Sequence, residues 1–354
     1  MKILKIFALA LLAPLVTVIA SHAEDFAVPL LVGQTGASAS FGKGETDAYT
    51  LAIEEWNARG GLNGKTIVPS LEDTQTSQQQ IVTAFHRVAL GKPSVILGPT
   101  WLDGFQAVIP LARKQHILLV TPSAAREAFA PENASWPITF YHNSTVEIQT
   151  LLKSLKEKGF TRPALVYEEE PFAEMIRKLV TQTDTKLVAD IGVQGGTTGF
   201  QSIITNLKSK KPDVLIVFVW DERSLLSLLQ QIHVQMPALT LATVHDGEGW
   251  LANPAFRPNL PHLIHTQFVI SDSTFKERFK KRFGYEPMLT ASNAYDAMNA
   301  VLQAYASGLS NAEEIRKYLL SQTFKTATFG TFKFNPDGSV PSQVEVVEVE
   351  STSK

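Results

Sequence analysis

Short, continuously apolar runs alternate with helical patterns through most of this chain, and this alternation limits its fold more than any other feature. Residues 27–32, 66–71, 95–97 and 117–120 form such runs, and residues 44–58 carry their apolar side chains at helical spacing. Strands without polar alternation are buried on both faces of a sheet. The pattern therefore predicts a parallel sheet with helices packed on both sides.

The alternation stops near residues 141–143 and then starts again. The later apolar runs 164–167, 214–219 and 239–244 are separated by further helical patterns. Two such series in one chain predict an α/β protein with two doubly wound parallel-sheet lobes.

The loops that follow the strands are the expected place for a ligand, because open parallel sheets bind at the carboxyl ends of their strands. Strand placement alone selects six loops, at residues 33–41, 98–104, 121–126, 168–172, 220–223 and 245–249. Three consecutive glutamates, at 168–170, stand in this set. We interpret them as a solvated charge run rather than as a cation site.

The first 23 residues have the pattern of a cleaved secretory signal. Lys2 and Lys5 precede an apolar run over residues 6–20, and residues 21–23 place small side chains at a cleavage site. The mature chain is then expected to begin near Glu24, and no later run approaches the roughly 20 apolar residues of a spanning helix. The chain has no cysteine, and therefore no acylation site for a lipoprotein anchor. These features favour the Gram-negative periplasm and no membrane anchor.

The sequence lacks the reactive motifs of common enzyme classes. It has no GxSxG or HExxH motif, and segment 60–66 fails as a phosphate loop because Arg59 stands where the first glycine is required. His245 and Asp246 form an acid–base pair with no accompanying nucleophile. Removing the signal, which carries two lysines and no acids, changes the formal net charge from −2 to −4. We expect a non-enzymatic protein with no cofactor, metal or nucleic-acid partner.

Segments spread along the chain resemble the periplasmic branched-chain amino-acid-binding (leucine/isoleucine/valine-type) proteins of ABC importers. They occur in the family's order over essentially the whole mature chain, at residues 42–44, 52–65, 73–74, 96–99, 117–125, 279–287, 294–297 and 332–338. The resemblance implies a type I periplasmic binding protein, whose two lobes are joined by three crossovers and close around a solute by hinge motion.

The resemblance also implies how the chain divides between the two lobes. Residues 1–23 are the signal, 24–142 and 248–330 form lobe one, and 143–247 and 331–354 form lobe two. The crossovers are then expected near Asn143, Asp246 and Gly330. The last apolar runs, 331–334 and 344–349, are expected to pair as a closing hairpin.

In relatives, hydroxyls and backbone amides of lobe one hold the carboxylate of an amino acid, and an acidic residue holds its ammonium. The resemblance places Asp246 at the acidic position, but Leu102 and Ala125 where relatives have hydroxyls. Two lost hydroxyls remove about 1–3 kcal/mol of charge-assisted bonding. Backbone N–H groups of residues 123–125 would then grip the anion, and a more apolar or aromatic solute is expected. The expected ligand contacts are Phe41, Thr100, Trp101, Leu102, Ser123, Ala124, Ala125, Phe172, Trp220 and Asp246.

The resemblance implies a monomeric solute receptor that delivers an amino acid or another small organic molecule to an inner-membrane ABC permease. Two alternatives stay open at this point. The same fold serves as a sensor subunit for a membrane signalling partner, and an exported enzyme can use the same scaffold, because fold alone does not exclude chemistry.

Overall fold

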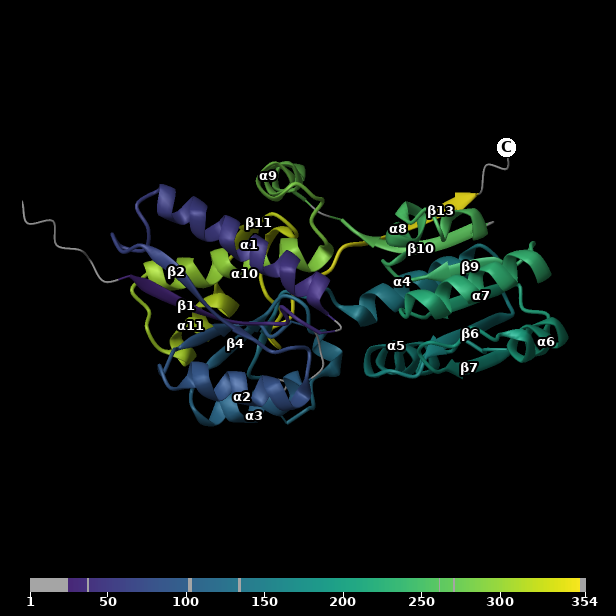
Figure 1. Cartoon of the computed structure of the whole chain (residues 1–354), viewed down its shortest axis with the longest axis horizontal. Helices are drawn as coiled ribbons and strands as arrows, with labels where there is room; N and C mark the ends of the chain where they lie inside the picture. Colours follow the sequence, from purple (N-terminus) through teal and green to yellow (C-terminus); the bar gives the residue numbers. More distant parts are fainter. Residues whose placement is uncertain are drawn as a thin grey trace, which may run out of the picture.

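The computed structural model describes residues 25–350 apart from 37, 101–103, 133–134, 261 and 270, with Ser273 described by its backbone only. The predicted signal segment 1–23 and the predicted ligand contacts Trp101 and Leu102 therefore lie outside the described residues. Figure 1 shows two α/β bodies lying side by side, which we call lobe one and lobe two. Among the described helices, none combines the length and apolar character that crossing a bilayer requires.

Lobe one is built on a five-stranded sheet in the order β2-β1-β3-β4-β5, with each neighbouring pair parallel. Its strands are β1 (Phe26–Val32), β2 (Ile67–Asp73), β3 (Val95–Leu97), β4 (Leu118–Thr121) and β5 (Ile138–Thr139). Three helices alternate with the first four strands, namely α1 (Ala39–Ala58), α2 (Gln78–Ala89) and α3 (Phe105–Lys114). The buried side chains of β3 and β4 confirm the reading of their apolar runs as interior strands.

Later parts of the chain return to lobe one and complete its core. They are α9 (Ser273–Phe283), α10 (Leu289–Ala306), α11 (Ala312–Ser321) and the strand pair β11 (Phe324–Thr326) and β12 (Gly330–Phe332). The axis of α10 lies close to α1 because small residues meet there, and a Cβ placed on Gly44 would lie 3.6 Å from the Cβ of Ala291. One apolar cluster joins α1, α10 and α11, and a second joins α2 and α3 on the other face of the sheet.

Lobe two is built on a six-stranded sheet in the order β13-β10-β9-β8-β6-β7. Its strands are β6 (Pro163–Glu168), β7 (Ala189–Val193), β8 (Val214–Phe218), β9 (Thr240–Thr243), β10 (His262–Phe268) and β13 (Val344–Glu350). All neighbours are parallel except the antiparallel pair β10 and β13. The helices are α4 (Ser144–Glu157), α5 (Pro171–Thr181), α6 (Gln201–Lys210), α7 (Glu222–Gln235) and α8 (Gly247–Ala252).

The structure corrects two expectations about the second half of the chain. Residues 248–330 were expected in lobe one from their first residue, but α8 and β10 belong to lobe two, since β10 pairs with β9. Polar residues interrupt the apolar pattern of β10, and its strand character was therefore not recognised. The expected closing hairpin is also absent, because β12 pairs with β11 and β13 pairs with β10.

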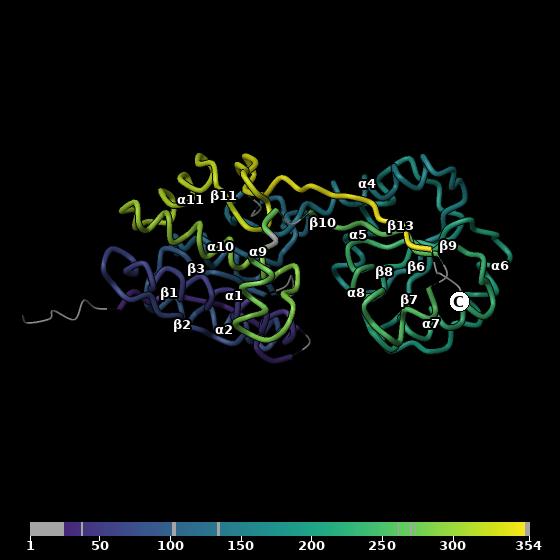
Figure 2. The backbone as a smooth tube through the Cα atoms, turned by 90° about the horizontal axis from the view of Figure 1, so that it is seen from above, coloured from purple at the N-terminus to yellow at the C-terminus, as the bar shows by residue number. Residues whose placement is uncertain are grey.

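Three chain segments pass between the lobes and contact one another. Asn143 N–H donates to Ser342 Oγ at 2.6 Å, and Val269 N–H donates to the Gln343 carbonyl at 3.2 Å. The second passage is also held to the β11–β12 turn of lobe one, since Ser271 N–H donates to the Thr328 carbonyl at 3.1 Å. In Figure 2 the last of these segments runs from lobe one across to β13. Two passages lie later than expected, after Phe268 instead of near Asp246 and close to Ser342 instead of near Gly330.

The rings of His142 and Phe268 hold the first two passages together. Their centroids lie 3.6 Å apart and their planes are 12° from parallel. His142 is only 1% exposed. Burial, with a smaller contribution from the charge on His245, lowers the pKa of His142 well below its ordinary value. A neutral imidazole therefore lies in an aromatic stack where the chain crosses between the lobes.

Candidate functional site

Three of the predicted ligand contacts come together at the end of lobe two from which the crossovers leave. Phe172 follows β6 at the start of α5, Trp220 follows β8, and Asp246 follows β9. The Phe172 and Trp220 rings are 5.3 Å apart in an edge-on arrangement. Trp220 Nε1 donates a hydrogen bond to Asp246 Oδ2 at 2.8 Å. Loops far apart in sequence thus form one aromatic and acidic surface.

Glu168 fixes the position of the Trp220 loop. Its Oε2 atom accepts the backbone N–H groups of both Trp220 and Asp221 at 2.8 Å. Glu170 accepts the Phe172 N–H at 3.0 Å and so caps α5. The acidic run expected to be a solvated patch is therefore a structural part of the site. For Glu168, only its partners 52 and 53 residues away in the chain reveal that role.

His245 and Glu147 form a buried ion pair beside Asp246 that sequence reasoning did not identify. Glu147 Oε1 lies 2.9 Å from His245 Nδ1, accepts the His245 N–H at 2.9 Å, and accepts the Thr266 hydroxyl at 2.6 Å. Burial opposes a charged imidazole, but Glu147 and then Asp246 outweigh it and raise the pKa of His245 to about 9. One cation thus lies beside two carboxylates. The pair was not identified from the sequence because only the fold brings α4 next to the end of β9.

The lobe one contacts are held differently from what was expected. Thr100 Oγ1 accepts the Gly33 N–H at 3.0 Å and donates to Glu45 at 2.6 Å. The N–H groups of Ser123 and Ala124 both donate to the Thr121 hydroxyl at 3.2 Å. Two of the three N–H groups of residues 123–125 thus have an acceptor within lobe one in this structure, and a role of this segment in holding an anion stays a prediction.

The remaining lobe one positions lie near the junction of the two lobes. Ala124 is fully buried in the core beside α2 and α3. Ala125 is 2% exposed and packs in the same cluster as Phe172 of lobe two. Phe41 lies half-buried on the first turn of α1. Ala125 is thus a point where the two lobes already touch.

A cavity of about 500 Å³ spans the two lobes beside this junction. Lobe one contributes the region around the start of α3, and lobe two contributes the first turns of α5. Glu127, which lines it, accepts the Thr145 N–H at 2.8 Å and so joins the lobes. Burial raises the pKa of Glu127. The cavity adjoins predicted contacts, because Pro171 precedes Phe172 in the chain and Gly104 follows the 98–103 loop.

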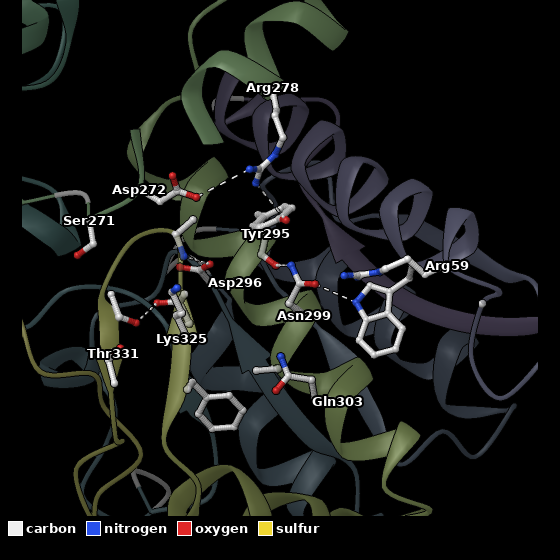
Figure 3. A pocket seen from close by; sticks show the side chains of 17 residues that line it. Arg59, Ser271, Asp272, Arg278, Tyr295, Asp296, Asn299, Gln303, Lys325 and Thr331 are labelled. Carbon is white, nitrogen blue, oxygen red and sulfur yellow. Dashed lines mark hydrogen bonds and ion pairs between the residues drawn. The ribbon is translucent and has the colours of Figure 1, made fainter. Parts of the chain in front are cut away.

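A larger cavity, of about 870 Å³, lies on lobe one between α1, α10 and the β11–β12 pair (Figure 3). In it, Asp296 accepts the N–H groups of Ala327 and Thr328 at 2.8 Å each. Asp296 is 1% exposed, and burial raises its pKa to about 6. None of the predicted ligand contacts that the structure describes lines this cavity. Asp296 therefore anchors the turn between β11 and β12 to α10 and is not part of the candidate solute site.

Among the described residues, no group of three or more His, Asp or Glu side chains is placed to hold a metal ion. Phe172 is only 4% exposed and packs in the lobe two core, whereas Trp220 is partly exposed against it. The surface at Trp220 and Asp246 therefore offers one oriented carboxylate and a hydrogen-bonded indole, with the Phe172 ring behind them. Such a surface suits the recognition of a small molecule carrying both a donor group and an apolar part.

Comparison with known proteins supports the family. A sequence model described as periplasmic binding protein matches residues 26–354. The Leu/Ile/Val-binding protein BraC3 of Rhizobium johnstonii is 25% identical over 265 residues, which cover 72% of this chain and 69% of that protein. A Leu/Ile/Val-binding protein of Citrobacter freundii is 23% identical, but the alignment spans only 54% of its length.

Solved structures show the same fold at low sequence identity. The substrate-binding protein LivJ of Streptococcus pneumoniae, in complex with isoleucine, is 20% identical with a TM-score of 0.77, and the match covers 92% of this chain and 96% of that one. A solute-binding protein of Rhodopseudomonas palustris, in complex with 3,4-dihydroxybenzoic acid, is 18% identical with a TM-score of 0.77 over 92% and 93%. The predicted two-lobed type I fold is thus confirmed.

These relatives are binding proteins of transporters rather than enzymes, in agreement with the interpretation of the sequence. The family match extends over nearly all described residues and includes both lobes. The chain belongs to the periplasmic binding protein family.

Proposed function

We propose that this chain captures a small organic solute between its two lobes in the periplasm and delivers it to an ABC permease of the inner membrane. The observation that carries the proposal is the Trp220–Asp246 hydrogen bond of 2.8 Å beside the Phe172 ring, at the carboxyl ends of β6, β8 and β9. It orients a carboxylate next to aromatic walls, on the lobe surface where this fold closes.

The proposed ligand is an amino acid or amino-acid-like molecule with an apolar or aromatic side group. Closure removes water from the ligand's charges, so an ammonium group needs a carboxylate partner such as Asp246. The partly exposed Trp220 ring, packed on the buried Phe172 ring, suits an apolar side group. One structural neighbour holds isoleucine, which carries the ammonium group that this proposal requires. Another holds 3,4-dihydroxybenzoic acid, which has no ammonium group and represents the competing ligand class.

Hinge closure is the proposed mechanism. The three passages that join the lobes are short and contact one another, so the lobes can rotate about this junction while each core stays intact. Ligand binding favours the closed form only by its differential affinity for that form. Groups from both lobes must therefore contact the solute, and the Glu127–Thr145 hydrogen bond marks one place where they already meet.

A thermal-shift screen of refolded, ligand-free protein tests the proposal. The panel contains aliphatic and aromatic amino acids, their amides, and aromatic acids. A true ligand at about 100 times its Kd adds about 2.7 kcal/mol to the free energy of unfolding, which gives a visible rise in Tm. A hit among amino acids supports the proposal as stated. Hits confined to acids without an amine would contradict the role given to Asp246, and no hit at all would contradict solute capture.

A further inference from the structure

Glu45 is a buried carboxyl group that the solute site does not use. It lies on α1, close to the start of the helix, and its side chain is 0% exposed. A buried carboxyl group requires hydrogen-bond partners to offset the loss of water. Its Oε2 atom accepts the Thr100 hydroxyl at 2.6 Å. The Glu45 side chain thus lies at the C-terminal ends of the lobe one strands, in contact with the loop after β3.

Glu45 reaches three of these loops through its neighbours. Thr100, on the loop after β3, accepts the N–H of Gly33 on the loop after β1 at 3.0 Å. Ser123, on the loop after β4, donates its hydroxyl to Glu45 as well. A single carboxyl group therefore connects the three strand-end loops of lobe one that sequence reasoning selected for ligand contact.

One oxygen of this carboxyl group and three other buried oxygen atoms have no hydrogen-bond partner among the described residues. They are Glu45 Oε1 and Tyr49 Oη on α1, and Thr290 Oγ1 and Asn293 Oδ1 on α10. Tyr49 is one turn from Glu45, and Asn293 donates through Nδ2 to the Pro122 carbonyl at 3.0 Å, beside Ser123. Buried polar atoms are normally satisfied by protein or by internal water. This cluster therefore has the acceptors and hydroxyls that an ordered water needs.

The charge state of Glu45 is sensitive to its surroundings. Burial raises its pKa to about 7, and the hydroxyls of Thr100 and Ser123 oppose the rise without cancelling it. Tyr49 is the titratable neighbour on the same helix, and burial together with the charge of Glu45 raises its pKa well above the ordinary value. From α10 the group faces the neutral Thr290 and Asn293, so no cation of the described residues compensates it.

We propose that Glu45 is a positioning residue for the ligand-facing loops of lobe one, acting through the Thr100 and Ser123 hydroxyls and completed by internal water shared with α10. The consequence for solute binding rests on the proposed function, whereas the ordering of the loops does not. In this arrangement Glu45 touches no solute. It fixes the positions of the three loops relative to one another, so that the groups they present to lobe two stay in place.

Hydrogen exchange of the full mature chain tests the proposal without any ligand. The variants are Glu45→Gln, which keeps an acceptor oxygen for Thr100, and Glu45→Leu, which has similar volume and no acceptor. Protection of the amides in residues 33–36, 98–100 and 121–125 is expected to fall about tenfold or more in the Leu variant and to stay near wild type in the Gln variant. Equal loss in both variants, or loss spread evenly over lobe one, would overturn the proposal.

Thr100→Val keeps the test valid even where Glu45→Leu does not fold. This change removes only the hydroxyl that joins Gly33 to Glu45. Exchange is expected to increase in residues 33–36 and 98–100 while residues 121–125 stay protected, because Ser123 bonds to Glu45 separately. Glu54→Gln, on the exposed face of the same helix, is the matched control and should leave all three loops unchanged. Unchanged exchange at Gly33 in Thr100→Val would overturn the proposed connection.

A pH profile distinguishes positioning through a titrating carboxyl group from simple packing. Since the pKa of Glu45 is higher in the folded than in the unfolded state, its contribution to stability is present at about pH 4.5 and lost as pH rises through about 7. Urea unfolding should therefore show a decline over this range that is larger in wild type than in Glu45→Gln. Identical profiles for the two proteins would overturn the titration of Glu45 in this range. Solute screening plays no part in these results, so a failed screen leaves them intact.

Discussion

At the scale of single residues, the end of lobe two that faces lobe one combines a cation with two carboxylates. His245 carries the positive charge, with Glu147 at 2.9 Å and Asp246 adjacent in sequence. Trp220 holds the Asp246 carboxylate from the other side. The positive charge of His245 thus lies next to Asp246, the acid that the proposed function uses. It offsets part of the negative charge of Glu147 and Asp246.

His245 makes stability dependent on pH in the alkaline range. Its pKa is raised to about 9 in the folded protein, so its contribution is full below about pH 6.5 and is lost as pH rises through about 9. A rise of this size corresponds to on the order of 3 kcal/mol. Urea unfolding between about pH 6 and 9.5 should show this decline in wild type and a flatter profile in His245→Gln. His233→Gln, exposed on α7, is the control, and a wild-type slope in His245→Gln would contradict the prediction.

At the scale of elements, α1 and α10 hold lobe one together, and close approaches of the backbone fix where they lie. A Cβ on Gly42, in the first turns of α1, would come 2.0 Å from the Gly33 carbonyl oxygen. The same helix carries Glu45 one turn further on. The beginning of α1 therefore sets the loop after β1 and the buried carboxyl group at the same time.

Gly42→Ala is expected to destabilise the protein by about 1–3 kcal/mol, because the new methyl group overlaps the Gly33 backbone, which cannot move independently of β1. Gly249→Ala in α8 is the matched control, since a Cβ there meets nothing within 4 Å. It should be neutral or stabilise by up to about 1 kcal/mol. Urea unfolding of both variants measures this, and the midpoint of Gly42→Ala should be the lower one. Equal midpoints would contradict the packing described for Gly42.

Asp296 anchors the turn between β11 and β12 to α10, and its replacement separates this anchoring from general packing. Asp296→Ala leaves the N–H groups of Ala327 and Thr328 without a partner and should cost roughly 2–5 kcal/mol. Asp296→Asn keeps one acceptor oxygen and should lose about half as much. Glu286→Gln, an exposed member of an ion pair with Lys280, should change stability little. Equal losses for the Asn and Ala variants, measured by urea unfolding, would contradict the two-bond anchor.

Sequence reasoning identified most elements but could not place the partners that cross between them. The apolar runs of β3, β4 and β8 were found because their side chains are buried on both faces. Strand β10 was missed, since His265, Thr266 and Gln267 make its pattern polar, although the first two are buried.

The candidate site shows the same limit. Phe172, Trp220 and Asp246 were predicted from their loops and from the resemblance, and the structure brings them together. Glu147 and Glu45 were not predicted, because their partners lie 98 and 55 residues away in the chain. One local signal did exist for Glu45, which falls at helical spacing with the buried residues Ala48 and Ala52.

At the scale of the whole molecule, two independent cores are joined by three short passages that meet around His142 and Phe268. The interlobe cavity of about 500 Å³ lies next to this junction. Large cores on both sides and few contacts between them favour rotation of whole lobes over local rearrangement. The fold thus provides a site that is completed only when the lobes approach.

Export of the whole molecule gives a further prediction. The segment 1–23 is expected to be removed on secretion, so protein recovered from the periplasm should begin at Glu24. Intact-mass analysis and N-terminal sequencing of protein from a periplasmic extract measure this directly. A chain from which residues 2–23 have been deleted serves as the control and should remain in the cytoplasm. Recovery of an unprocessed chain in the membrane fraction would contradict the proposed location.

The central claim is that Asp246 takes part in binding a solute between the lobes. Calorimetric titration of the strongest hit from the solute screen into ligand-free wild type and Asp246→Asn tests it most directly, with Asp190→Asn, an exposed ion-pair partner of Arg177, as control. The Asn side chain keeps an oxygen for Trp220 but loses the charge, so affinity should fall about tenfold or more while Tm without ligand stays nearly unchanged. Equal affinity of wild type and Asp246→Asn would contradict the claim.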